Sequence, residues 1–264
     1  MAETICAAKA SLMIWKKRMK RCDFIKTMAA GIGGLTMFGT RGQSAVPLCA
    51  GPVVGDPKVR GPFPILSTPF TASGDVDCDV LAKEAQFVDW CGCPGMIWPQ
   101  SGDSVDLLTT EEKLHGMEVL ANAVRGRRSA LCLGVQGKDT EEMLLFAEHA
   151  EKLAPAAIIS RPPDSGKTEN DLRQYWRALD DRGKRPVIIQ TSGGTQYKGP
   201  APSVKLLIEL AKESPYFGYV KEETSPIVSR MKELVAAKPT IKKVFSAMGA
   251  GLAGCIRRAS ARRD

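Results

Sequence analysis

One lysine is the strongest candidate in this sequence for covalent chemistry. Lys221 follows Tyr219 and Val220 in a short apolar run. A lysine at the end of a buried strand loses part of its hydration, which favours the neutral amine that attacks a carbonyl carbon. The same position also suits a lysine that pairs with Glu222 or Glu223, or one that reaches out to solvent. The run alone therefore leaves a nucleophile and a structural ion pair open.

Polar residues follow several other short apolar runs in the same way. These polar positions are Thr68, Gln100 to Gly102, Gln136, Arg161 to Asp164, and Gln190 to Ser192. In a parallel barrel the reacting groups sit at the carboxyl ends of the strands. We therefore expect these side chains to share one face with Lys221. Asp164 stands in a Pro-Asp-Ser-Gly run, where it is either an acid or base of this face or a solvated turn carboxylate.

Short apolar runs alternate with amphipathic stretches of helical length through the middle of the chain. The apolar runs have the length of buried strands and cover residues 63–66, 95–98, 130–135, 156–159, 186–189, 217–220 and 243–245. The amphipathic stretches cover residues 80–90, 110–124, 139–153, 172–179, 202–213 and 226–237. We expect Thr110, Asp139 or Thr140, and Ser225 with Pro226 to mark helix starts.

This strict alternation predicts an α/β protein with a parallel sheet and helical crossovers. A doubly wound open sheet often carries a glycine-rich phosphate loop after its first strand, but the first run here is followed by Thr68–Thr71. The glycines at 31–34 have no strand before them. The pattern therefore favours a TIM (β/α)8-type barrel, incomplete, with about seven strands present and a targeting leader in front.

The two ends of the chain differ in composition from its middle. We divide the chain into a basic leader and linker at 1–58, a barrel domain at 59–249 and an irregular basic tail at 250–264. The apolar stretch at 27–39 is too short to span about 30 Å of hydrocarbon, so no stable membrane span is expected. The tail contains no pattern of an eighth strand, which favours a truncated end over a helix that covers the gap.

The leader is similar to an export signal. Residues 20–26, with the sequence KRCDFIK, resemble a twin-arginine signal in which lysine replaces the first arginine. This resemblance implies export to the periplasm. A disordered basic leader, or a start codon assigned too far upstream, is the alternative and would leave the protein in the cytoplasm.

The net charge of +8 comes from the two ends. Residues 1–60 and 257–264 hold 14 of the 37 basic and 4 of the 29 acidic residues, which leaves 23 basic and 25 acidic residues between them. A nucleic-acid-binding surface on the folded body is therefore not expected. The eight cysteines form no CxxC pair, and only two histidines accompany them, so we expect no metal site.

Three segments together resemble one known family. They are residues 61–77, residues 101–112, and residues 219–224 with the sequence YVKEET, in that order and spacing over about 185 residues. The combination is similar to the dihydrodipicolinate synthase/N-acetylneuraminate lyase family of class I aldolases. The resemblance implies a barrel that needs no cofactor, acts on pyruvate or a related 2-oxo acid, and commonly assembles as a homo-oligomer.

The resemblance also implies roles for individual residues. Lys221 would attack the ketone to form an imine, whose protonated form acts as an electron sink beside the bond that forms or breaks. Ser101 and the backbone N–H groups around Gly102 would hold the carboxylate of the 2-oxo acid, because neutral donors stabilise an anion without quenching the lysine. Gln100 stands with Ser101 where the family has two threonines.

Two proton-relaying tyrosines of the family have no counterpart here. Gln190 falls on one of these positions and Asp164 falls near the other. An amide does not titrate near neutral pH, so Gln190 cannot relay a proton as a phenol does, whereas Asp164 is a candidate substitute. Dihydrodipicolinate synthase activity itself is therefore not expected. Three alternatives stay open: a Schiff-base lyase or aldolase, a degenerate member that binds a small molecule, and a non-functional fragment of a longer enzyme.

Overall fold

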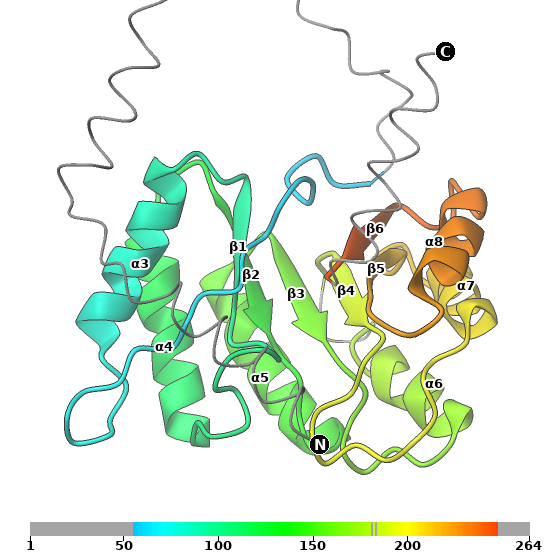
Figure 1. Cartoon of the computed structure of the whole chain (residues 1–264), viewed down its shortest axis with the longest axis horizontal. Helices are drawn as coiled ribbons and strands as arrows, with labels where there is room; N and C mark the ends of the chain where they lie inside the picture. The colour runs from blue at the N-terminus through cyan, green and yellow to red at the C-terminus, as the bar shows by residue number, and fades with distance from the viewer. Residues whose placement is uncertain (1–54, 181, 183, 248–264) are drawn as a thin grey trace, which may run out of the picture. The chain divides into compact units, whose positions relative to one another are not determined.

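The computed structural model describes residues 55–247 except 181 and 183. The expected leader, its twin-arginine-like run and the tail at 250–264 lie outside these residues, so export and the nature of the tail stay predictions. In the described part, helices and strands alternate along the chain (Figure 1). None of the described helices is long and apolar enough to cross a membrane.

Six strands and six helices make up the described elements. The strands are β1 Gly95–Trp98, β2 Ala130–Gly134, β3 Ala157–Ser160, β4 Val187–Gln190, β5 Tyr219–Glu222 and β6 Lys243–Ser246. The helices are α3 Cys78–Trp90, α4 Thr110–Ala123, α5 Thr140–Leu153, α6 Glu169–Arg177, α7 Val204–Glu213 and α8 Ile227–Ala236.

The strands form one parallel sheet in the order of the chain, from β1 to β6. Helices connect the successive strands, and the sheet is curled as part of a barrel (Figure 1). Because all strands run the same way, their carboxyl ends lie at one edge and their amino ends at the other. The predicted α/β barrel-type fold is confirmed as a half-barrel of six strands.

The first of the seven predicted strands is reduced to a single pairing. Ile65 forms an isolated parallel bridge with Ile97 of β1, and the N–H of Leu66 donates to the Ile97 carbonyl at 3.0 Å. Pro62 and Pro64 flank this position and have no N–H to donate, so a longer ladder cannot form. The segment still occupies the place of a strand beside β1.

The helix starts differ slightly from those expected, for local reasons. Thr109 rather than Thr110 caps α4, because Thr109 and Glu112 form a reciprocal capping box. Thr168 and Asp171 form a second box, so α6 begins three residues before the predicted 172. Asp139 caps α5, as one of the two alternatives predicted.

Alternation along the strands divides the apolar side chains into two groups. The outward side chains pack against the helices and include Trp98, Leu133, Ile158, Ile189 and Val220. The inward side chains form a second cluster with Ile97, Cys132, Ile159, Ile188 and Tyr219. Since the period of a strand is two residues, the inward row continues after Ile188 and Tyr219 to Gln190 and Lys221. The curled sheet thus places Lys221 on its inner face, at the carboxyl edge.

Cys132 belongs to the buried inner row and has no disulfide partner. Burial raises the pKa of the Cys132 thiol, and the charge of Lys221 acts in the opposite direction. The thiol is therefore protonated and behaves as an apolar side chain. The described residues contain no group of three or more metal-ligating side chains.

Candidate active site

The Lys221 side chain is held at the carboxyl edge by two neighbours. Its Nζ lies 3.2 Å from Oε1 of Gln190 and 3.1 Å from Oε1 of Glu223. Lys221 is only 6% exposed, so the amine does not reach out to bulk solvent. The backbone register aligns Gln190 of β4 with Lys221 of β5, which brings these two predicted residues together.

Glu223 belongs to a closed circuit of polar side chains around the amine. Its second carboxylate oxygen accepts a hydrogen bond from the Ser192 hydroxyl, and Ser192 Oγ accepts one from Gln190 Nε2 at 3.0 Å. The backbone N–H of Glu223 donates to Thr191 Oγ1 at 2.9 Å. The circuit therefore runs from Lys221 through Glu223, Ser192 and Gln190 back to Lys221, and it fixes the carboxylate beside the amine.

The neighbouring carboxylate of Glu222 points to the other face of the sheet. It is fully buried and accepts hydrogen bonds from Arg230 Nε at 3.0 Å, Thr191 Oγ1 at 2.7 Å and the N–H of Thr224 at 2.8 Å. Of the two pairing partners considered for Lys221, Glu223 is thus the one in contact. Glu222 instead ties β5 to α8.

A second group of polar residues lies at the carboxyl ends of β1 and β3. Arg161 is buried and donates from Nη1 to Ser101 Oγ at 2.8 Å and to Asp106 at 3.3 Å. Its Nη2 makes a further, shorter contact with Asp106. A Cβ added to Gly194 would lie 2.3 Å from this Nη2 atom, so the guanidinium also packs against the segment after β4. Arg161 therefore extends from the Ser101 turn toward the loop that carries Ser192.

The turn at 101–104 is fixed by hydrogen bonds that link it to Thr68 and, through Thr68, to Trp98 of β1. The N–H of Thr68 donates to Asp103 Oδ1 at 2.9 Å, and Trp98 Nε1 donates to Thr68 Oγ1 at 3.0 Å. The N–H of Ser101 is already used, because it donates to Oε1 of Gln100 at 2.6 Å. Gly102 has a φ of +96°, a value that favours glycine, and its N–H has no hydrogen-bond acceptor among the described residues. Gly102 thus keeps the donor that the family resemblance requires, whereas Ser101 offers its hydroxyl.

Three buried polar atoms at this edge have no partner in the part of the chain that the structure describes. They are Nε2 of Gln100, Oε1 of Gln136 and Oδ1 of Asp164. Gln136 is held by its other amide atom, which donates to the Pro99 carbonyl at 2.9 Å. An unsatisfied buried polar atom costs roughly 1–3 kcal/mol, so such atoms often indicate where a ligand or water binds. Their gathering at strand ends favours this edge as a site for a polar molecule.

Asp164 lies with Arg161 and has no recorded contact with Lys221. Burial raises the pKa of the Asp164 carboxyl, and the Arg161 guanidinium opposes this shift. Burial also lowers the pKa of Lys113, whose ammonium is near Asp106 and Asp164. The predicted role of Asp164 as an acid or base at the amine of Lys221 is therefore not supported by a direct contact.

The sequence indicates Glu223 only as an ion-pair partner of Lys221, and it does not indicate the contact between Arg161 and Ser101. A signal for Glu223 was available, because residue 223 follows 221 by one strand period and so faces the same side. The contact between Arg161 and Ser101 joins residues 60 positions apart, and no local pattern indicates it.

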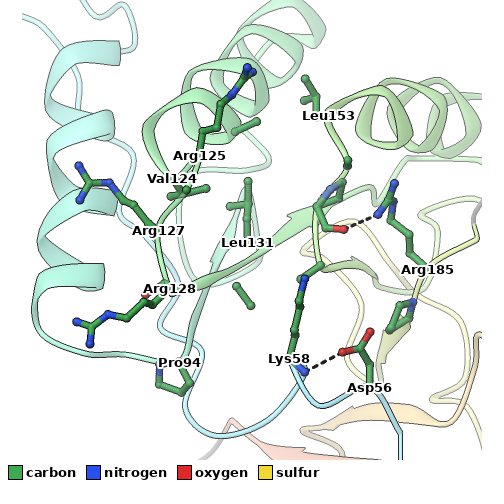
Figure 2. A pocket seen from close by; sticks show the side chains of 18 of the residues that line it. Asp56, Lys58, Pro94, Val124, Arg125, Arg127, Arg128, Leu131, Leu153 and Arg185 are labelled. Carbon is green, nitrogen blue, oxygen red and sulfur yellow. Dashed lines mark hydrogen bonds between the residues drawn. The ribbon is translucent and has the colours of Figure 1, made fainter.

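A large cavity lies at the opposite edge of the sheet from Lys221. Its volume is about 930 Å³, and it is lined by residues near the amino ends of the strands, among them Pro94, Arg128 and Arg185 (Figure 2). Catalytic groups of parallel barrels lie at the carboxyl edge, so cavity size alone does not locate the candidate active site.

Comparison with known proteins gives no matching family model but clear relatives. The chain is 29% identical over 169 residues to 4-hydroxy-tetrahydrodipicolinate synthase of Rhizobium meliloti, covering 64% of this chain and 56% of that protein. It is 22% identical over 183 residues to L-2-keto-3-deoxyarabonate dehydratase of Azospirillum brasilense, covering 68% of this chain and 58% of that protein. The chain thus spans somewhat more than half the length of these curated relatives.

Solved structures share the fold. N-acetylneuraminate lyase of Proteus mirabilis matches with a TM-score of 0.65 and 18% identity, over 74% of this chain and 66% of that one. Dihydrodipicolinate synthase of Cyanidioschyzon merolae matches with a TM-score of 0.64 and 21% identity, over 70% and 62%. Together with the half-barrel and the matching order of the three segments, these comparisons make the chain similar in sequence and in fold to members of the dihydrodipicolinate synthase/N-acetylneuraminate lyase family of class I aldolases.

Proposed function

We propose that this chain is a lyase that forms an imine between Lys221 and the ketone of pyruvate or a related 2-oxo acid. The single observation that carries the proposal is the place of the Lys221 amine. It is buried on the inner face at the carboxyl edge of the sheet, between an amide and a carboxylate. Reacting groups of parallel barrels occupy this edge.

The chemistry begins once the Lys221 amine has lost a proton. Its nitrogen attacks the ketone carbon, the resulting carbinolamine loses water, and a protonated imine remains. The positive nitrogen then withdraws electrons from the adjacent carbon, so that a carbon–carbon bond beside it can break or form. No cofactor is needed for these steps, because the imine itself supplies the electron sink.

The carboxylate of the 2-oxo acid would bind at the Ser101 turn. The Gly102 N–H and the Ser101 hydroxyl are the donors there, and the Arg161 guanidinium adds a positive charge. Asp106 already compensates part of that charge and is itself about 40% exposed on its side chain. A bound carboxylate would thus either compete with Asp106 for the Arg161 guanidinium or share the guanidinium with Asp106.

Gln190 favours a second candidate function, a binder without catalysis. An amide stands where the family carries a phenol, and unpartnered amide atoms of Gln100 and Gln136 at the same edge suit ligand recognition. Such a protein would keep the 2-oxo acid site and lose turnover.

The test is reductive trapping of the imine. Wild-type protein is incubated with pyruvate and a panel of 2-oxo acids, reduced with borohydride and measured by intact mass. We expect a stable adduct on Lys221, and peptide mapping should locate it.

Two lysine variants make the test specific. Lys221→Arg keeps the positive charge beside Glu223 but removes the nucleophile, so it should fold normally and give no adduct. Lys113→Ala is the matched control, because the pKa of Lys113 is lowered and its amine is the natural competitor. An adduct that persists in Lys221→Arg, or none on folded wild-type protein, would refute the proposal; tight binding without an adduct would favour the binder.

A further inference from the structure

We propose that the Glu223 carboxylate transfers the protons of the Lys221 reaction. This inference rests on the proposed function and assigns the role that two missing tyrosines leave open. Oε1 of Glu223 lies 3.1 Å from the Lys221 nitrogen, within the reach required of a general acid or base. Gln190 lies equally near but has no proton to exchange near neutral pH.

The other titratable groups nearby are engaged elsewhere. Glu222 lies on the outer face with Arg230, and Arg161 holds Asp106 and Ser101. The Cys132 thiol faces the same interior but is kept protonated by burial. Within the described residues, Glu223 is therefore the acidic side chain that contacts the reacting nitrogen.

The proton balance closes with Glu223 alone. The carboxylate first takes a proton from the Lys221 ammonium, which gives a neutral amine and a carboxylic acid. The amine adds to the ketone, and its proton moves to the new oxygen to give a neutral carbinolamine. The Glu223 acid then donates its proton to that hydroxyl, water leaves, and the protonated imine forms while the carboxylate is restored.

The surrounding circuit makes Glu223 a precise donor and acceptor. Ser192 donates to the other carboxylate oxygen, and Gln190 in turn donates to Ser192 Oγ. This leaves Oε1 directed at Lys221 and restricts rotation of the carboxylate. Ser192 and Gln190 are thus positioning residues, and the glutamine has a structural reason to occupy the tyrosine position.

An inert ion pair predicts the opposite effect of mutation, which makes the proposal testable. A carboxylate that only pairs with Lys221 favours the ammonium, so its removal would increase the neutral amine and accelerate imine formation. A carboxylate that acts as acid and base accelerates the step, so its removal would slow imine formation by about 10²- to 10⁴-fold. The direction of the rate change separates the two roles.

The experiment measures single-turnover borohydride trapping of pyruvate, or of the 2-oxo acid that wild type traps best, from pH 5 to 9. We expect Glu223→Gln to trap the ligand about 10²- to 10⁴-fold more slowly than wild type. Glu111→Gln, which removes an exposed carboxylate of α4, is the charge-matched control and should behave as wild type. Trapping by Glu223→Gln at the wild-type rate or faster would overturn the proposal.

A rescue experiment covers the case in which Glu223→Gln folds poorly. Glu223→Ala leaves space for a small carboxylate, and added formate should restore part of the trapping rate in proportion to its concentration. A folded Glu223→Ala that stays inactive at all formate concentrations, or that needs no formate, contradicts the proposal. Absence of trapping by wild type itself would instead refute the proposed function.

A second and independent observation concerns the cavity at the amino edge. Its volume is about 930 Å³, and Figure 2 shows Arg127 and Arg128 on one side and Lys58 and Arg185 on the other. Eight basic residues line this cavity, whereas Asp56 is its one acidic residue. The body between 61 and 256 has slightly more acidic than basic residues, so this concentration is local and total charge did not reveal it.

Most of these cations have no carboxylate partner. Arg127 pairs with Asp89 at 3.7 Å and Arg185 with Glu151 at 3.0 Å. The other six form no ion pair in the described part of the chain: Lys58, Arg60, Arg125, Arg128, Lys152 and Lys184.

Helix ends explain only part of this cluster. Helices α4 and α5 end at this edge, and cations stabilise the carbonyl groups of helix carboxyl ends. Arg127 Nε donates to the Ala123 carbonyl and Arg185 Nη1 donates to the Pro155 carbonyl, both at 2.8 Å. These are the two arginines that already pair with carboxylates, so helix ends do not account for the six other cations.

We infer that this cavity binds a compact anion that carries several phosphate groups. Its cations come from three loops and from the last turn of α5 around a hollow, which suits a small multiply charged molecule. A nucleic-acid duplex needs an extended stripe of charge, and a membrane needs a protruding surface. The site is remote from Lys221 and does not depend on the proposed function.

Calorimetry with inorganic tripolyphosphate at 50 mM salt tests this inference. We expect binding that weakens steeply with salt and that falls at least tenfold in an Arg125→Gln/Arg128→Gln variant. Lys205→Gln, at an exposed position of α7, is the control and should bind as wild type. No binding by wild type, an equal loss in the control, or tighter binding of duplex DNA with the same two arginines would each overturn the inference.

Discussion

The two edges of the sheet both carry charged side chains, but these charges are paired at the carboxyl edge and mostly unpaired at the amino edge. At the carboxyl edge the charges form pairs with at least one buried member, as in Lys221 with Glu223, Arg161 with Asp106, and Glu222 with Arg230. At the amino edge the cations are exposed and mostly unmatched. The first arrangement fixes side-chain geometry for chemistry, whereas the second creates an electrostatic potential that attracts a ligand.

The contrast between paired and unpaired charges indicates how single charges at each edge affect the stability of the fold. A buried ion is costly unless its partner is present, so the carboxyl edge depends strongly on each pair. Exposed like charges repel one another only weakly in water, so the amino edge tolerates them at small cost. Mutations that remove single charges should therefore have large effects at one edge and small effects, of opposite sign, at the other.

The largest effect is expected for Arg230→Ala. Glu222 is fully buried, and loss of Arg230 leaves its carboxylate with only two neutral hydrogen-bond donors. We expect the free energy of unfolding to fall by about 3–5 kcal/mol, measured by urea denaturation. Lys205→Ala, which breaks an exposed pair of α7, is the comparison and should cost about 0.5 kcal/mol or less. Equal effects of the two variants would contradict the contrast between buried and exposed charge.

An intermediate effect is expected for Asp89→Asn, at a buried carboxylate of the amino edge. The backbone N–H of Ser129 lowers the pKa of Asp89 below its ordinary value of 3.8, with further help from Arg128 N–H and Arg127. The asparagine keeps the shape but weakens these charge-assisted bonds, so we expect a loss of about 1–3 kcal/mol at neutral pH.

The pH dependence of this loss follows from the sign of the shift. A lowered pKa in the folded state stabilises the fold above the ordinary carboxyl pKa, and the contribution disappears as the pH falls through the folded-state value. The difference in melting temperature between wild type and Asp89→Asn should therefore be constant above about pH 5 and shrink toward pH 3. A difference that stays constant over this range would show that Asp89 contributes through packing alone.

The sequence alone was sufficient to predict the helices and strands and the part of the candidate site that contains Gln190 and Lys221. The alternation of apolar runs predicted a parallel, incomplete barrel, and the positions of the strand ends placed Gln190 and Lys221 on one face, where the register of β4 and β5 aligns them. The first strand was overestimated because Pro62 and Pro64 interrupt its ladder, which the apolar run does not show. Contacts such as that of Arg161 with Ser101 depend on how distant loops meet, and no local pattern encodes that.

The amino edge was missed for a different reason. Net charge was counted over the whole body, where acidic and basic residues nearly cancel. Lys58, Arg128 and Lys184 lie in separate loops near the amino ends of different strands, and a parallel sheet brings such loops together as surely as it gathers the carboxyl ends. Charged residues just before the strands of a parallel sheet therefore gather at one edge, as polar residues just after the strands gather at the other.

The smallest effect, and the most informative sign, is expected for Arg128→Gln. The Arg128 side chain has no ion-pair partner in the described region, so its removal takes away repulsion among the cavity cations and no attraction. We expect the free energy of unfolding to stay the same or rise by up to about 0.5 kcal/mol, with the gain disappearing in 0.5 M salt because salt screens the repulsion. Thermal unfolding at low and high salt measures both. A clear loss of stability that salt does not change would mean that Arg128 is held by packing, and the amino edge would then resemble the carboxyl edge.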